Sequence, residues 1–298
     1  MDPRIVLVTG ANGFVGSHVC QRLAEQGVHV RALVRRKGET PELQHPGIEE
    51  GEGEFTDATD CKRAVPGADA VVHCAATAGD DIDHVRHVNT HGTQSIANAA
   101  LDEGMDRFVH ISTGAVYDRD ERAVVDEDTP MVDEGAPYAV TKAEAEEVVH
   151  NYHEEGLPTV ILRPPAILGV GPTSTWGSRV PGMVLDGELT TQTSGETTLA
   201  WVHVDDLVDA VALALNEDTA VGRTYNVVGG HTTWQRYVDD IRSWADEELP
   251  SPFPEGAEAG WQGEFTTDRI RDELGWEPAR SYEQAMEEIR QWWADQED

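Results

Sequence analysis

Tyr138 and Lys142 lie four residues apart in the stretch YAVTK and could together move a proton. On a helix, side chains at positions i and i+4 share one face, one turn apart. A neighbouring ammonium favours the phenolate and should lower a tyrosine pKa from about 10 toward working pH. We therefore expect Tyr138 to act as general acid/base for a carbonyl–alcohol pair.

Three glycines, Gly10, Gly13 and Gly16, lie between a short apolar run and a segment with apolar residues at helical spacing. Gly10 permits a tight bend, Gly13 lets the backbone approach a pyrophosphate, and Gly16 lets the helix pack closely on the strand. The N–H groups near Phe14 and Val15 would then face the phosphates. The pattern predicts a dinucleotide-binding turn.

A cationic stretch, Arg35-Arg36-Lys37, follows a β-rich run at 28–34. An acid at the end of such a strand bonds the ribose 2′-hydroxyl and selects NAD, whereas arginine accepts a 2′-phosphate through its planar fork. The first acid after the run is Glu39. We therefore favour NADP(H) as the cofactor and keep NAD(H) as the alternative. The other interpretation of the stretch is a solvated cationic loop that binds no ligand.

The stretch HISTGAVY at 110–117 adds two hydroxyls, Ser112 and Thr113, at the end of an expected strand. Ligands bind at the carboxyl ends of strands in open α/β sheets. A hydroxyl in this place can hydrogen-bond the reacting oxygen while Tyr138 transfers the proton.

Strands and helices alternate through the first half of the chain. The expected strands are 4–9, 28–34, 69–76, 107–113 and 159–165, and the expected helices are 14–26, 81–103 and 138–155. This alternation predicts an α/β fold with a Rossmann-type, doubly wound parallel sheet. Later segments are less regular, with helices at 205–216, 233–246 and 282–294 and a strand at 223–228. We expect a dinucleotide-binding domain over 1–165 and a smaller C-terminal α/β substrate lobe over 166–298, with 199–228 as a segment that could return to the first domain.

The charge of the chain is strongly acidic. Its 298 residues include 22 Lys and Arg against 56 Asp and Glu, a net charge of −34. The carboxylates are dispersed, and salt at about 1 M shortens the screening length to roughly 3 Å, which would relieve their repulsion. We expect a protein of a high-salt organism, with an acidic protein from ordinary salt as the alternative. The acid balance also argues against nucleic acid and anionic membranes as partners.

The cysteines and apolar runs bear on location. Cys20, Cys61 and Cys74 show no CxxC spacing, so disulfide and zinc frameworks are not expected. No apolar run approaches the roughly 18 residues of a membrane span, and the N-terminal stretch MDPRIVLVTG does not read as a signal peptide. We expect a cytoplasmic protein.

Seven stretches, in order TGANGFVG, HCAA, VNTHGT, HISTGAVY, YAVTK, LRPPAILG and WVHVDDL, resemble the extended short-chain dehydrogenase/reductase superfamily in its NAD-dependent epimerase/dehydratase family. The resemblance runs on to 272–285. It implies a Ser/Thr–Tyr–Lys triad, and counting back four residues from Tyr117 assigns its hydroxyl to Thr113. It further implies that Tyr138 is the acid/base and that Lys142 holds the nicotinamide ribose.

The resemblance also implies adenine contact by Gly53-Glu54, a segment under the cofactor at 74–76, and an asparagine near the site, Asn89. Pattern and resemblance together predict these cofactor-binding residues: Gly10, Asn12, Gly13, Phe14, Val15, Gly16, Arg35, Arg36, Glu54, Phe55, Cys74, Ala75, Ala76, Asn89, Tyr138, Lys142 and Pro165. The candidate substrate residues are Thr77, Thr113, Trp176 and Arg179.

Departures from the family pattern bear on the reaction. Sugar-nucleotide dehydratases carry an Asp-Glu pair after the triad hydroxyl, where this chain has Gly114-Ala115. Many epimerases hold a diphosphate with an asparagine at the position of Ala166 and an arginine in the stretch that here reads Leu199-Ala200-Trp201. We therefore favour a carbonyl reductase or alcohol dehydrogenase for a small molecule. A sugar-nucleotide 4-epimerase with tightly bound cofactor is the alternative, and a non-catalytic dinucleotide sensor the second.

Two further features concern partners. The helices expected at 81–103 and 138–155 are those that this superfamily pairs, so the resemblance implies a homodimer. His84, His87 and His91 follow one another along the first of these helices at a spacing that could bind a metal. Hydride chemistry needs no metal, and we predict none.

Overall fold

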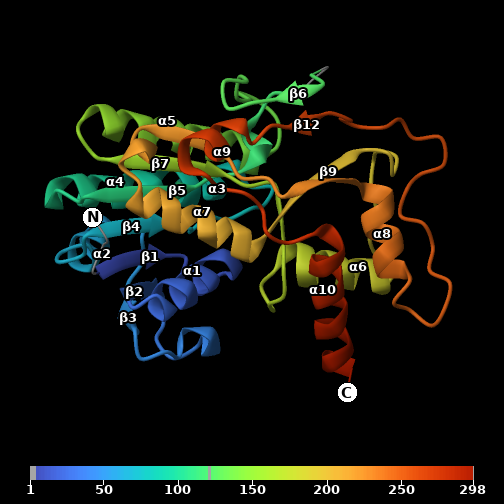
Figure 1. The fold of residues 1–298 in the computed structure, drawn as a ribbon, viewed down its shortest axis with the longest axis horizontal. Helices are drawn as coiled ribbons and strands as arrows, with labels where there is room; N and C mark the ends of the chain where they lie inside the picture. The colour runs from blue at the N-terminus through green and yellow to red at the C-terminus, as the bar shows by residue number, and fades with distance from the viewer. Residues whose placement is uncertain (1–4, 120–121, 298) are drawn as a thin grey trace.

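A seven-stranded parallel sheet forms the centre of the protein in a computed structural model, which describes residues 5–119 and 122–297; Arg4, the first residue of the first expected strand, lies outside them. The strand order is β10-β7-β5-β4-β1-β2-β3 (Figure 1). The strands are β1 Ile5–Thr9, β2 His29–Val34, β3 Ile48–Glu52, β4 Ala70–His73, β5 Arg107–Ile111, β7 Thr159–Arg163 and β10 Arg223–Asn226. The predicted doubly wound α/β fold is thereby confirmed.

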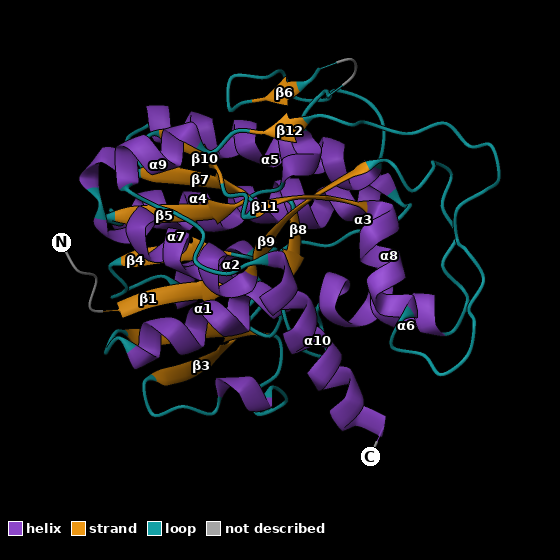
Figure 2. Ribbon diagram, turned by 45° about the vertical axis from the view of Figure 1, so that its right-hand side comes forward, coloured by secondary structure: helices purple, strands orange, loops and turns teal. Residues whose placement is uncertain are grey.

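Helices cover both faces of this sheet (Figure 2). Alternate residues of a strand face opposite sides, so Val6 and Val8 pack into one apolar cluster and Leu7 into the other. The first cluster contains buried side chains of three helices, α1 Phe14–Glu25, α7 Val204–Asn216 and α9 Asp268–Leu274. The second takes in α2 Ala58–Ala64, α4 Gly92–Glu103 and α5 Pro137–Glu154.

Three elements of this part differ from the sequence prediction, and one of them, the short helix α2, was not expected at all. The strand β3 was missed because its residues, IEEGE, are mostly carboxylates that solvate the outermost position of the sheet. The helix expected at 81–103 is divided into α3 Ile82–Arg86, a π-helical turn η2 His87–His91, and α4. Such an insertion shifts the face that a helix presents and is frequent at functional sites.

A second sheet lies beside the first and carries the later part of the chain, at the right of Figure 1. It has the order β11-β9-β8, with β8 Ala166–Leu168, β9 Thr198–His203 and β11 Gly230–Thr233. Its apolar cluster includes side chains of α6 Val180–Leu185, α8 Trp234–Arg242 and α10 Tyr282–Glu297. Within the segment 199–228, β9 belongs to this sheet, whereas α7 and β10 join the seven-stranded layer.

The remaining elements are short. They are η1 Pro41–Leu43, η3 Gly114–Val116, the strand pair β6 Val124–Val125 and β12 Glu264–Phe265, the π-helical η4 Thr175–Arg179, and η5 Asp218–Ala220. The helix expected at 233–246 ends at Arg242 as α8.

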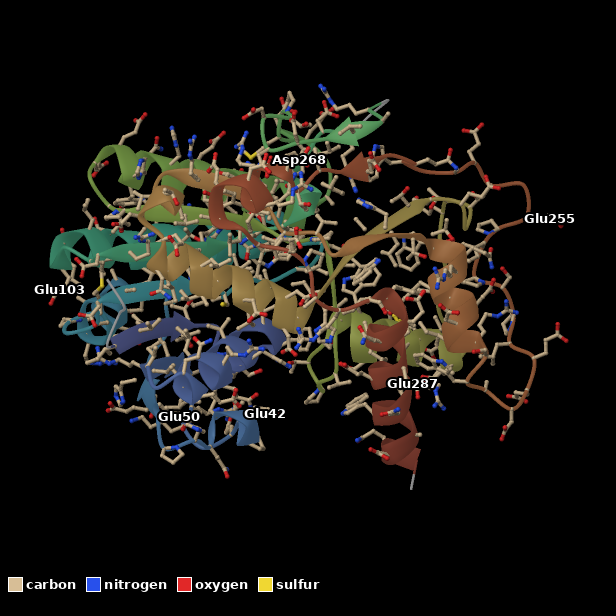
Figure 3. All side chains as sticks on the ribbon, viewed as in Figure 1. Glu42, Glu50, Glu103, Glu255, Asp268 and Glu287 are labelled. Atoms are coloured by element: carbon tan, nitrogen blue, oxygen red, sulfur yellow. The ribbon has the colours of Figure 1, made fainter. Side chains whose placement is uncertain are left out.

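Acidic side chains lie all around the periphery. Figure 3 labels Glu42, Glu50, Glu103, Glu255, Asp268 and Glu287 on elements far apart in the sequence, with Glu103 and Glu255 at opposite ends of the molecule. The carboxylates are thus dispersed in space as well as in sequence.

None of the helices in the described ranges has the length and apolar character that a membrane crossing requires.

A buried ion pair fixes α5 on the sheet. Arg163, at the end of β7, donates through Nε and Nη2 to the carboxylate of Glu146, with contacts of 2.5–3.0 Å. Glu146 and Arg163 are 3% and 6% exposed, so neither charge is screened by solvent. The hydroxyl of Ser112, after β5, donates to the same carboxylate. Three elements therefore meet at one carboxylate.

Glu146→Gln removes the charge with little change of shape and leaves Arg163 buried without the carboxylate that it pairs with. Breaking a buried pair in this way costs about 3–5 kcal/mol, and we expect that loss in the free energy of unfolding measured in denaturant. Glu147→Gln, the exposed neighbour on α5, is the control and should change stability by less than about 0.5 kcal/mol. Equal stability of the two variants would contradict this account of the pair.

Candidate active site

The glycine turn is packed too closely to admit side chains. Gly10 has φ of 65°, in the left-handed region, and the N–H of Gly13 donates to its carbonyl at 2.9 Å. A Cβ on Gly16 would lie 2.1 Å from that carbonyl oxygen, and one on Gly10 would lie 2.7 Å from the backbone of Ala75. The turn therefore brings β1, α1 and the end of β4 into backbone contact.

The N-terminus of α1 fits an anion. Its N-cap, Gly13, has no side chain to accept from the first-turn N–H groups. The neighbouring Asn12 is exposed, and the ring of Phe14 packs against Gly169 and Gly171 from the second part of the chain. A dinucleotide pyrophosphate is the ligand that this chemistry accepts in a strand–turn–helix unit.

The segment after β4, residues 74–76, has one buried side and one exposed side. Ala75 is buried against Gly10, and the N–H of Cys74 donates to the carbonyl of Thr9 at 3.2 Å. Ala76 is exposed. Phe55, in contrast, packs on His73 with ring centroids 5.4 Å apart and belongs to the apolar cluster, so its ring is mainly a core contact.

The two arginines after β2 differ in their contacts. Together with Asn12 and Glu54 they line a cavity of about 440 Å³. Arg36 forms an ion pair with Glu39 at 3.1 Å, whereas Arg35 is exposed and makes no ion pair with any described residue. One guanidinium beside this cavity is therefore available to an anion.

The structure brings Thr113, rather than Ser112, to Tyr138. Burial raises the pKa of Tyr138, and a hydrogen bond with the Thr113 side chain opposes the rise. The Thr113 hydroxyl also accepts from the N–H of Ala115 at 3.2 Å, whereas Ser112 is engaged by Glu146. The hydroxyl and phenol are thus next to each other where β5 ends and α5 begins.

Lys142 is 2% exposed and directed at β5. Its Nζ donates to the carbonyl of Ile111 at 2.8 Å and lies 3.2 Å from Nε2 of His110. Burial lowers the pKa of Lys142 to about 8, which Glu146 partly opposes. We predicted that Lys142 lowers the pKa of Tyr138. That prediction is wrong for this structure, because burial of the phenol is the largest influence on its pKa and raises it.

Asn89 connects the segment after β4 to α5. Its Nδ2 donates to the carbonyl of Thr77 at 2.9 Å and to Oγ1 of Thr141 at 3.0 Å, while its Oδ1 accepts from the N–H of Thr77 at 2.8 Å. Thr141 directly precedes Lys142. The sequence showed no sign of this link, since it depends on the π-helical turn that carries Asn89.

The two candidate substrate residues in the second part of the chain, Trp176 and Arg179, have different surroundings. Trp176 packs on Trp234 and Tyr237, at centroid distances of 5.2 and 5.9 Å, and is partly buried in the aromatic cluster there. Arg179 is exposed at the end of η4. Pro165 lies beside Gly114, the residue after Thr113, since a Cβ on Gly114 would be 3.7 Å from the Cα of Pro165.

The three histidines of the helix at 82–103 are exposed. His87 and His91 have ring centroids 6.2 Å apart, and His84 lies a turn earlier in α3. Over residues 5–119 and 122–297, no group of three His, Cys, Asp or Glu side chains is arranged to hold a metal ion.

Comparison with known proteins identifies the family. The model of the NAD dependent epimerase/dehydratase family matches residues 6–228. This chain belongs to that family, as the seven stretches of sequence implied, and is an NAD(P)-dependent enzyme of the extended short-chain dehydrogenase/reductase type.

Three individual proteins show the range of similarity. The chain is 30% identical to the low-salt glycan biosynthesis protein Agl12 of Haloferax volcanii, over 95% of this chain and 96% of that one. It is 38% identical to a 2-alkyl-3-oxoalkanoate reductase of Stenotrophomonas maltophilia, over 56% and 52% of the two chains. The crystal structure of a dTDP-glucose 4,6-dehydratase from Streptomyces venezuelae, with NAD bound, matches with a TM-score of 0.82, 26% identity and coverage of 98% and 97%.

Gly16→Ala should open the glycine turn, because the added Cβ would overlap the Gly10 carbonyl. We expect the dissociation constant for the dinucleotide, measured by fluorescence titration, to rise at least about tenfold. Gly51→Ala is the control, since a Cβ in that strand of the same sheet meets only atoms 3.9 Å away. Unchanged binding by the Gly16 variant would refute the assignment of this turn.

Proposed function

We propose that this protein is an NADP(H)-dependent carbonyl reductase or alcohol dehydrogenase for a small molecule. The observation that carries the proposal is the interaction between the side chains of Thr113 and Tyr138 where β5 ends. A hydroxyl and a phenol side by side can both donate to one substrate oxygen. The candidate cofactor residues at the glycine turn and the candidate substrate residues Thr77, Trp176 and Arg179 complete the proposed site.

A bound nicotinamide supplies the hydride. In reduction, Thr113 would orient the substrate carbonyl and Tyr138 would give its proton to the oxygen. The phenol is the form that can give this proton, and the raised pKa of Tyr138 keeps it in that form at neutral pH. An ammonium has three donors, and two of those on Lys142 have partners, so the third is available to a ribose hydroxyl.

Three features favour net redox chemistry over dehydration or epimerisation. A 2-alkyl-3-oxoalkanoate reductase is 38% identical to the chain over 56% of its length. Gly114 and Ala115 replace the acid pair of a dehydratase, and Ala166 replaces the asparagine that holds a sugar-nucleotide diphosphate. A sugar-nucleotide 4-epimerase remains the second candidate, supported by a UDP-glucose 4-epimerase of Azospirillum brasilense that is 27% identical over 93% of this chain and 88% of that one. It would interconvert sugar nucleotides without consuming added cofactor.

NADP(H) is the proposed cofactor because Arg35 faces a cavity and has no ion pair with a described residue. A guanidinium left unpaired in so acidic a chain suits a 2′-phosphate. A homodimer and a high-salt origin also stay predictions. The ion pair between Arg86 and Glu144, at 2.8 Å, connects the two helical segments implied in dimer contact.

Tyr138→Phe should reduce kcat for ketone reduction by about 10²–10⁴-fold, since the general acid is lost, with little change in dinucleotide binding. Tyr152→Phe, later on the same helix, is the matched control and should retain activity. Both rates come from NADPH oxidation in molar salt over a panel of carbonyl compounds. Full activity of the Tyr138 variant would end the proposal.

Arg35→Ala should weaken NADPH binding by about tenfold or more while leaving NADH binding nearly unchanged, because the lost guanidinium meets only the 2′-phosphate. Lys37→Ala makes the same charge change two residues away and should affect neither cofactor. An equal loss of both cofactors in the Arg35 variant, or a wild-type preference for NADH, would reject NADP(H).

A further inference from the structure

His110 is a polar ring in the interior of the sheet with one hydrogen-bond partner. It lies on β5, is fully buried, and approaches Nζ of Lys142 through Nε2 at 3.2 Å. Its Nδ1 is buried and has no partner among the described residues. Burying a polar group is unfavourable unless it is hydrogen-bonded. The contact with Lys142 is therefore the feature that explains an imidazole at this position.

His73, on the neighbouring strand β4, shows what a structural histidine looks like here. Its ring centroid is 5.3 Å from that of His110. Nδ1 of His73 pairs with Oγ1 of Thr9 at 2.6 Å, and Nε2 pairs with Oγ1 of Thr93 at 2.9 Å. Both nitrogens of His73 are thus satisfied within the protein frame, and neither contacts Lys142.

The groups around the Lys142 amine determine its charge. Burial disfavours the ammonium, whereas Glu146 on α5 favours it. Cys74, after β4, is a neutral thiol near pH 8, because burial raises its pKa to about 12. Burial, Lys142 and His73 all lower the pKa of His110, so its ring is neutral at pH 7. A neutral imidazole can accept through Nε2 when its proton is on Nδ1. Because the ammonium is the donor in that bond, the contact stabilises the charged lysine.

We propose that His110 is a positioning residue: its Nε2, together with the Ile111 carbonyl, holds the Lys142 amine at the end of β5 and keeps it an ammonium. The catalytic meaning of this role rests on the proposed function, in which Lys142 binds the nicotinamide ribose. The hydrogen bond between His110 and Lys142 does not itself depend on the proposed function. His110 would thereby determine the alkaline limit of activity.

The test uses the small number of lysines. The chain has three, Lys37, Lys62 and Lys142, of which the first two are exposed. NMR of protein labelled with ¹³C at lysine Cε gives three signals, and Lys142→Met identifies the buried one. In wild type we expect that signal to titrate near pH 8, in line with the lowered pKa of about 8.

His110→Phe should lower the Lys142 midpoint by about one pH unit, since a hydrogen bond to a charged group is lost. His110→Gln keeps an acceptor oxygen and should restore the wild-type midpoint. His73→Phe puts the same ring on the adjacent strand without touching the amine and should leave the midpoint unchanged. A wild-type midpoint in the His110→Phe protein overturns the proposal.

Turnover gives a second readout. The alkaline limb of the pH–rate profile should move to lower pH in His110→Phe by the same amount as the lysine midpoint, and return in His110→Gln. If Tyr138→Phe stays active, the proposed function fails while the lysine titration still decides the role of His110. Should His110→Phe not fold, ¹⁵N-histidine spectra of wild type replace it: the Nε2 signal of His110 must titrate with the Lys142 midpoint, and independent titration refutes the contact.

Discussion

The burial of the Lys142 ammonium is the constraint on which the site depends. A charge taken out of water must find hydrogen-bond acceptors, and those available are the Ile111 carbonyl and His110. Because the Lys142 amine must reach both acceptors, the rotation of α5 about its axis and its position along β5 are fixed. Tyr138, one turn earlier on the same helix, then comes to Thr113.

The rest of the fold holds this arrangement in place. The Glu146–Arg163 pair anchors α5 one turn beyond Lys142 to the end of β7. Asn89 anchors the segment after β4 to the same helix. Because β1, β4 and β5 are parallel neighbours, their carboxyl ends meet at one edge of the sheet. The glycine turn and the phenol therefore come to the same edge although 128 residues separate Gly10 from Tyr138.

Much of this could be predicted from local pattern. The spacing of the three glycines and of Tyr138 and Lys142 encodes geometry within one turn or one helix, and apolar runs identified the inner strands. The acidic strand β3 lacks such a run, and the π-helical turn at 87–91 leaves no trace in periodicity. The direction of the lysine amine depends on distances between elements, which spacing along one chain does not contain. The ion pair that engages Arg36 but not Arg35 lies within one loop and depends on side-chain conformation, which spacing does not contain either.

The central claim is that this site moves a hydride between a nicotinamide and a carbonyl carbon with net redox change. The most direct measurement is isotope transfer from NADPH carrying deuterium at C4 of the nicotinamide, with the product alcohol analysed by mass spectrometry. We predict one deuterium at the carbinol carbon for each NADPH oxidised. Turnover of sugar nucleotides with no deuterium gained and no NADPH consumed would contradict the account.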